Sequence, residues 1–158
     1  LALPLIKEAK PIINPSLLEN YKKYKFTKKN TKSFIENTSK ILELNKQGLE
    51  LNFELGALVY SLMLRIRSLL MIKLINNNER YTKSLLFTYL ENIGLGKGKI
   101  NELYRIYANE RKDFKIRRSA TIAKEDILAL IKTAEKTLQE IKGAFQWARR
   151  SIWRELEV

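Results

Sequence analysis

The sequence has 158 residues, contains neither cysteine nor histidine, and carries 30 Lys and Arg against 17 Asp and Glu, a formal net charge of +13. The missing side chains exclude disulfides, thiolate zinc sites, cysteine-held iron–sulfur clusters and the usual Ser-His or Cys-His nucleophile pairs. The hydrophobic fraction of 45% is enough for a folded core. Because the net charge exceeds the roughly 2–8 that a small domain needs for solubility, it favours a polyanionic partner over a merely solvated surface.

Residues 1–32 are predicted to form an N-terminal arm before a helical domain at 33–158. Asn14 followed by Pro15 is typical of a helix start and predicts a short helix there. The stretch Tyr21–Lys32 carries six lysines and is either a solvated basic linker or a strip that contacts phosphates. Residue 1 is Leu rather than Met, so we expect it not to be the native start. Residues 2–6 are too short for an export signal, and we expect a cytoplasmic, nucleoid-associated protein.

Asn30 or Thr31 is predicted to cap the first long helix, which weakens or ends at Gly48. Positions with helical spacing mark its inner face: Phe34, Ile35, Thr38, Ile41 and Leu42. This spacing predicts an amphipathic helix with one buried face.

The next helix is predicted from about Asn52 to Ile75 and is apolar over more than half of its circumference. Such a helix is typical of the centre of a bundle. It is also long enough to suggest a membrane span. However, Arg65 and Arg67 lie at its middle and Lys73 near its end, where charges are costly in lipid. We therefore expect a buried helix and no membrane contact.

Two shorter helices are predicted after the polar break at Asn76–Asn78. The first runs from about Tyr81 to Asn92 and ends at Gly94 as its C′ residue. The second runs from about Ile100 to Lys112. The expected inward side chains are Leu85, Leu86, Tyr89, Leu90 and Ile93 in the first, and Ile100, Leu103, Tyr104 and Tyr107 in the second.

A long helix capped by Thr121, with Glu125 and Asp126 in its first turn, is predicted to end the chain. Its apolar residues alternate at spacings of four and three, as in a heptad stripe: Ile127, Ile131, Ala134, Leu138, Ile141, Phe145, Ala148 and Ile152. No stretch shows strand alternation. The predicted fold is therefore all-α, a compact bundle of about five to six helices with a long C-terminal helix.

Basic residues between and at the ends of these helices are the candidate binding residues. Arg80, Tyr81 and Lys83 begin a helix, where cations and backbone N–H groups can bind an anion; ordinary solvation is the alternative. Basic residues with an interleaved aromatic near Phe114 suit nucleotides or single strands, and a solvated loop is again the alternative. The predicted nucleotide- and nucleic-acid-binding residues are Arg67, Arg80, Tyr81, Lys83, Lys97, Lys99, Arg111, Lys115, Arg117 and Arg118.

No catalytic or metal-binding residues are predicted. The Gly-x-Gly-x-Gly run at Gly94–Gly98 is not a phosphate loop, because no strand precedes it; it predicts a tight corner between helices. The acidic side chains near it are scattered, with no paired carboxylates for a two-metal site: Glu79, Glu91, Glu102, Glu110 and Asp113.

Residues 64–104 resemble the C-terminal helical domain of the archaeal and eukaryotic primase large subunit. The resemblance rests on Arg67–Leu70, the break at Asn76–Asn78, the run Lys83–Gly94, and then Ile100 and Tyr104 six and ten residues after the glycine. The cluster-binding cysteines of that family are absent, and Glu91 stands where a lysine can occur. The chain is in this respect similar to the cluster-free third primase subunit of some archaea, PriX.

The resemblance implies a non-catalytic primase accessory in DNA replication, with no iron–sulfur cluster and with ATP or another nucleoside triphosphate as its ligand. It places the contacts to the initiating nucleotide and the single-stranded DNA template on Arg80 and Lys83, with Lys115, Arg117 and Arg118 downstream. It also implies the catalytic and large primase subunits as partners. Two alternatives remain: an inactive HEPN-like RNA-binding module, which the run Glu110–Lys115 resembles, and a pure assembly subunit.

Overall fold

The computed structural model describes residues 25–110 and 122–155, and the side chains of 25–109 and 122–145. Within these residues the chain is all-α, with no strand, which confirms the predicted fold class. The five helices are α3 (Lys28–Glu50), α4 (Leu55–Asn76), α5 (Lys83–Glu91), α6 (Lys97–Glu110) and α7 (Lys124–Glu155). The predicted division into 1–32 and 33–158 stays a prediction, although α3 already begins at Lys28.

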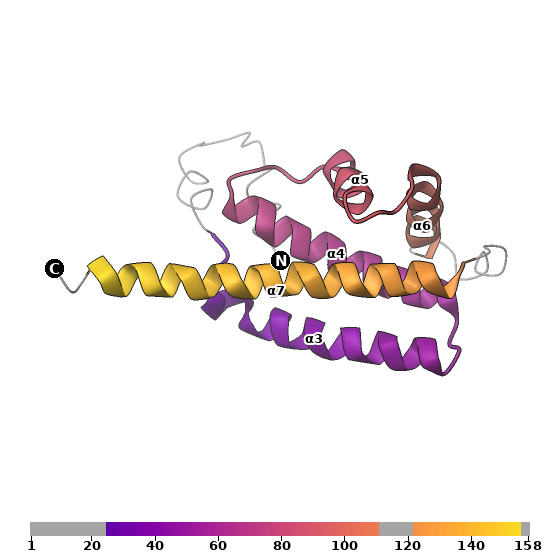
Figure 1. The fold of residues 1–158 in the computed structure, drawn as a ribbon, viewed down its shortest axis with the longest axis horizontal. Helices are drawn as coiled ribbons and strands as arrows, with labels where there is room; N and C mark the ends of the chain where they lie inside the picture. The colour runs from indigo at the N-terminus through magenta and orange to yellow at the C-terminus, as the bar shows by residue number, and fades with distance from the viewer. Residues whose placement is uncertain (1–24, 111–121, 156–158) are drawn as a thin grey trace, which may run out of the picture.

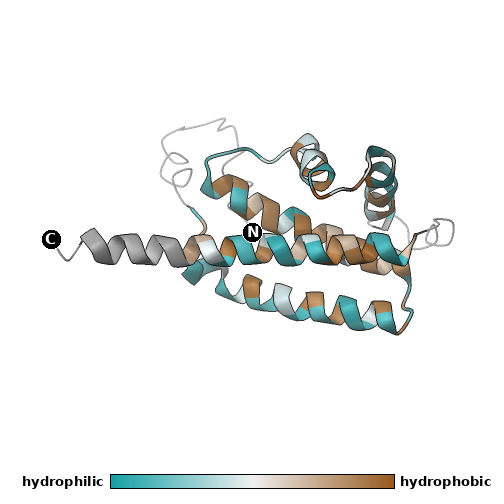
Figure 2. Cartoon of the chain, in the orientation of Figure 1, coloured by the Kyte–Doolittle hydropathy of each residue, from teal (hydrophilic) through white to brown (hydrophobic). Residues whose placement is uncertain are grey.

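Helix α4 lies at the centre of the bundle. It packs against α7, α6 and α3, and α5 and α6 lie on the side of α4 away from α3 (Figure 1). Its buried side chains include Val59, Leu62, Met63, Ile66 and Leu69, all with no exposed surface. Burying a side chain of this size stabilises the fold by about 1.5–3 kcal/mol. The hydropathy of α4 in Figure 2 is correspondingly high along most of its length.

By length and composition alone, α4 is long and apolar enough to cross a membrane. Half of its most apolar stretch is buried inside the bundle. Its packing on three sides accounts for its apolar surface, because a central helix must bury nearly every face.

Helix α3 begins earlier than predicted. Thr27 is the N-cap, and it exchanges hydrogen bonds with Asn30: the Thr27 Oγ1 atom accepts from the Asn30 backbone N–H at 3.3 Å, and the Asn30 Oδ1 atom accepts from the Thr27 N–H at 2.7 Å. The predicted cap at Asn30 or Thr31 is wrong, because the side chain of Asn30 closes this box from the third helical position. Lys28, Lys29 and Lys32 are consequently helical rather than part of a linker.

The chain just before α3 is attached to the end of α4. Phe26 is buried, and its backbone N–H donates to Asn76 Oδ1 at 2.8 Å while Asn76 Nδ2 donates to the Phe26 carbonyl at 3.0 Å. The first residue of the asparagine break therefore has a structural role. Asn78, two residues later, has a positive φ of 61°, a conformation that asparagine tolerates better than most residues.

Helices α5 and α6 differ from the prediction at their starts. Thr82 caps α5 by accepting from the Leu85 N–H at 3.1 Å, so the helix begins at Lys83 rather than Tyr81. Leu85 is 37% exposed, and its predicted inward position is wrong, because Leu86 and Leu90 take the buried face of this short helix. Gly94 has a positive φ of 94°, but its predicted position as the C′ residue is wrong, because the C-cap is Asn92 and Gly94 follows it by two residues. Helix α6 starts at Lys97 instead of Ile100.

The stripe on α7 is buried as predicted from Ile127 to Ile141, and Phe145 is partly buried against the core. The first turn contains Glu125 and Asp126, and Asp126 accepts a hydrogen bond from the Ala123 N–H at 3.1 Å. The predicted cap Thr121 and the side chains of Ala148 and Ile152 lie outside the described residues.

Candidate nucleotide and nucleic-acid interface

Three of the predicted binding residues, Arg67, Tyr81 and Lys83, lie among the same group of aromatic rings. Arg67 on α4 donates from Nη1 to the Tyr107 hydroxyl at 3.1 Å, and its Cζ lies 5.4 Å from the centre of the Tyr81 ring. Lys83, the first residue of α5, has its Nζ 4.3 Å from the centre of the Tyr104 ring. These contacts join α4, the loop after it, α5 and α6.

The rings form a continuous set. The Tyr60 and Tyr107 rings stack at 5.6 Å, Tyr104 lies 5.8 Å from Tyr107, and Phe87 meets Tyr104 edge-on at 5.2 Å. These are the separations at which aromatic pairs attract one another beyond simple burial. We name the group the aromatic–cation cluster and define it by its members: Tyr60, Arg67, Tyr81, Lys83, Phe87, Tyr104 and Tyr107.

Arg67 is the fixed cation of the cluster. Its half-burial acts to lower its pKa, but the hydrogen bond to Tyr107 and the charge interactions with Tyr107 and Tyr81 outweigh this, so the pKa of Arg67 is raised. The guanidinium therefore stays charged at every ordinary pH. Burial raises the pKa of Tyr81, and the nearby Arg67 only partly opposes that effect, so the Tyr81 hydroxyl keeps its proton.

Lys83 is the accessible cation of the cluster. Its side chain is exposed, and its Nζ lies over Tyr104 and also 5.0 Å from the centre of the Phe87 ring. Within the part of the chain that the structure describes, Lys83 makes no ion pair with a carboxylate. A cation–π contact at an exposed site is worth about 0.5–1 kcal/mol, which is little enough that a phosphate can take the ammonium group from the rings.

The other predicted cations have different surroundings. Arg80 is exposed and precedes Tyr81 in the loop, and Lys97 is exposed at the start of α6. Lys99 is held at 3.1 Å by both Glu102 and Asp126, and these hydrogen bonds raise its pKa. This lysine connects α6 to the start of α7, so a phosphate would have to displace two carboxylates to reach it.

The remaining predicted residues, Arg111, Lys115, Arg117 and Arg118, lie outside the described residues. The segment that contains them follows Tyr107, at the far end of α6, by only a few residues in the sequence. Their binding role stays a prediction.

Apart from Tyr81, the aromatic members of the cluster were not predicted as binding residues. Tyr104 and Tyr107 were assigned to the core, and Tyr107 is indeed 3% exposed. Their spacing of three residues places both on one face of α6. The sequence therefore indicated that the two rings share a surface. The sequence did not show that Arg67 and Lys83 would reach that face from other helices.

The residues described offer no group of three acidic side chains that could hold a metal ion. The sequence matches no protein-family model and no curated protein, and the fold matches no solved structure. Nothing in these comparisons identifies the chain as a primase domain. The functional argument therefore depends on the cluster itself.

Proposed function

We propose that this chain is a non-catalytic helical domain that binds a nucleoside triphosphate and single-stranded nucleic acid, and that it serves as an accessory to primer synthesis. The observation that supports this most directly is the position of Lys83, an exposed cation held over the half-buried rings of Phe87 and Tyr104. Proteins that bind single strands commonly combine cations for the phosphates with aromatic faces for the bases.

In the proposed mechanism Lys83 moves from the rings to a phosphate, and Arg80 contacts a neighbouring phosphate or the template. Arg67 acts differently. Because Tyr107 and Tyr81 hold its guanidinium, its part is to position Tyr81 and to keep positive charge behind the site. Charge placed in advance in this way attracts a polyanion without a cost of reorganisation.

The chemistry of bond formation belongs to a partner in this proposal. The described residues provide no carboxylate cluster for metal ions, which phosphoryl transfer requires. A separate catalytic subunit supplies those groups, and this domain contributes the position of the first nucleotide next to the template. The assignment to priming in particular rests on the sequence resemblance of residues 64–104.

The test compares binding of ATP, AMP and a short single-stranded DNA at two salt concentrations. We expect ATP to bind more tightly than AMP, since it offers more phosphate oxygens. Lys83→Ala should weaken ATP binding about tenfold, corresponding to about 1.4 kcal/mol for one charge-assisted contact. It should also reduce the slope of log affinity against log salt for DNA by about 1.

Lys40→Ala is the matched control, because Lys40 is an exposed lysine on α3, away from the cluster. Both variants should keep the helical circular dichroism of the parent. If Lys83→Ala and Lys40→Ala bind ATP and DNA equally well, the cluster is not the site. Nucleic-acid binding without a triphosphate preference would instead favour a general RNA- or DNA-binding module.

A further inference from the structure

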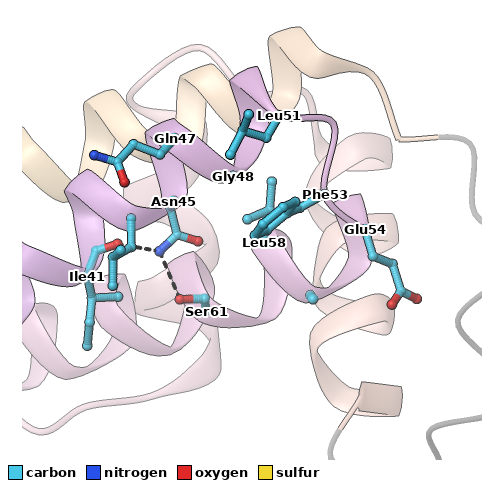
Figure 3. A pocket seen from close by; sticks show the side chains of 11 residues that line it. Ile41, Asn45, Gln47, Gly48, Leu51, Phe53, Glu54, Leu58 and Ser61 are labelled. Atoms are coloured by element: carbon cyan, nitrogen blue, oxygen red, sulfur yellow. Dashed lines mark hydrogen bonds between the residues drawn. The ribbon is translucent and has the colours of Figure 1, made fainter.

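A second surface, separate from the aromatic–cation cluster, is a groove between the end of α3 and the start of α4. The groove has a volume of about 630 Å3 and is lined largely by apolar side chains (Figure 3). Leu44, Leu51 and Phe53 lie along it and are 62%, 67% and 59% exposed. They are three of the five large hydrophobic side chains that are exposed in the described part of the chain. Exposed apolar residues gathered in one place mark interaction sites.

The spacing along both walls is that of a helix-packing seam. On α3 the residues that face the groove include Ile41, Leu44 and Gly48, at intervals of three and four, and the C-cap residue Leu51 follows three positions later. Ile41, Leu44 and Leu51 form a second apolar stripe beside the buried face of α3, which includes Ile35, Leu42, Gly48 and Leu49. On α4 the groove residues Ala57 and Leu58 lie four and three positions before Ser61. Two such stripes side by side accept the apolar edge of a third helix.

Gly48 shapes this groove. A Cβ atom added there would lie 3.1 Å from Leu58 and 3.3 Å from the Phe53 ring, so the glycine lets both side chains approach α3 closely. Figure 3 shows Phe53 and Leu58 next to Gly48. The turn that places Phe53 is fixed by Asn52, which has a positive φ of 56° and accepts a hydrogen bond from Lys124.

A polar atom at the groove lacks a partner. Asn45 is 4% exposed, and its Nδ2 donates to the Ile41 carbonyl at 2.6 Å and to Ser61 Oγ at 3.0 Å. Its Oδ1 atom is buried without a hydrogen bond and points to the side where Phe53 and Leu58 lie (Figure 3). An unpaired buried acceptor is unfavourable, because burial deprives it of the hydrogen bond that it would make to water.

The stretch of sequence that forms the groove carries a net negative charge, whereas the protein as a whole is basic; Lys124 from α7 reaches Asn52 beside the groove. Between residues 43 and 61 the sequence has three acidic residues, Glu43, Glu50 and Glu54, and one basic residue, Lys46. Lys46 forms an ion pair at 2.6 Å with Glu135 on α7. The last turn of α3 contains no basic residue, so its own side chains leave the negative end of the helix dipole uncompensated. A partner with basic residues fits this end of the bundle.

From these observations we infer that the α3–α4 groove binds an amphipathic helix of a partner protein, with apolar residues at heptad spacing and lysine or arginine beside them. The residues of this groove are distinct from those of the aromatic–cation cluster. Loss of one site therefore leaves the other testable.

The test uses a fluorescein-labelled synthetic helix about three heptads long, with Leu at the apolar positions and Lys elsewhere, and measures binding to the whole chain by fluorescence anisotropy. Leu51→Lys should weaken binding at least about tenfold, because it removes an apolar contact and adds a repelling charge. Leu128→Lys, at another exposed leucine (45%) on α7, is the matched control and should bind within about twofold of the parent. Glu50→Lys should weaken binding by changing the charge alone, and Leu44→Lys repeats the Leu51→Lys change at a second position of the stripe.

Equal binding to Leu51→Lys, Leu44→Lys and Leu128→Lys would overturn the inference. The inference is also overturned if a helix with Glu in place of Lys binds the parent and loses as much affinity in Leu51→Lys as the Lys helix does. In that case the charge of the partner does not matter. The last measurement is the oligomeric state of the chain without peptide, by analytical ultracentrifugation. A dimer that Leu51→Lys dissociates would show that a second copy, and not a basic partner helix, covers the groove.

Discussion

The contact between Phe26 and Asn76 gives the sharpest test of how the bundle is held together. Asn76 makes two hydrogen bonds to the backbone of Phe26, at 2.8 and 3.0 Å, across fifty residues of sequence. Asn76→Ala removes both hydrogen bonds. The Phe26 N–H and carbonyl then lose these partners, next to the Phe26 side chain, which is only 9% exposed.

The magnitude follows from the two bonds. Each contributes about 0.5–1.5 kcal/mol net, and an unsatisfied buried group costs about 1–3 kcal/mol. Because Asn76 is only half-buried, water can reach part of the vacated space, and we expect the free energy of unfolding to fall by about 1–3 kcal/mol in total. Urea denaturation followed by circular dichroism measures this as a lower midpoint at an unchanged slope.

Asn77→Ala is the matched control, since Asn77 is the next residue in the same asparagine run and is exposed. Its backbone N–H bonds to Lys73 and Leu74 do not involve its side chain, so the substitution should change stability by less than about 0.5 kcal/mol. If the two variants unfold at the same urea concentration, the anchoring role of Asn76 is refuted. Hydrogen exchange should also become faster at the Phe26 amide in Asn76→Ala alone.

Three further predictions concern the core, the cluster and pH. Ile66→Ala should lower the free energy of unfolding by about 2–5 kcal/mol, since Ile66 is fully buried on α4; a loss below 1 kcal/mol in urea denaturation would contradict the central position of α4. Tyr107→Phe removes the hydroxyl that accepts from Arg67 and should cost about 1.5–3 kcal/mol by the same measurement, whereas no loss would mean that water replaces this bond. The hydrogen bond with Glu140 raises the pKa of Lys73 above its usual 10.5, so this pair stabilises the fold fully below pH 10.5 and the contribution is lost as the pH rises through the raised value. The stability difference between the parent and Glu140→Gln should therefore shrink above that pH, and a constant difference would show that the pair does not titrate as described.

The periodicity of the sequence was sufficient for the fold class and for most of the core. The stripe on α7 and the nearly continuous apolar surface of α4 are buried as their spacing predicts. Helix starts were less predictable, because capping depends on which of several polar residues closes the first turn. At α3 the N-cap is Thr27, which forms a capping box with Asn30, and not Asn30 or Thr31. At α5 the N-cap is Thr82, although the helix was expected to start at Tyr81.

The sequence indicated only part of the aromatic–cation cluster, and its binding role stays a prediction. Arg67 was selected as a cation on the apolar helix, and Tyr81 and Lys83 for their position near the start of the next helix; the structure brings the three together around shared rings. Lys99 had the same local signal, but the fold places it between Glu102 and Asp126. A cation's neighbours on other helices decide whether it faces a ligand or an internal carboxylate, and sequence spacing does not report them.

The sequence by itself determined that the chain is helical, basic, without cysteine or histidine chemistry, and centred on one apolar helix. These properties follow from composition and from a period that is local to each helix. The tertiary structure decided which side chains meet over long sequence separations: Arg67 with Tyr107, Phe26 with Asn76, and the second stripe of α3 with the start of α4. Such contacts depend on how helices cross and on where each one starts, and a shift of one residue turns a helical side chain by about 100°.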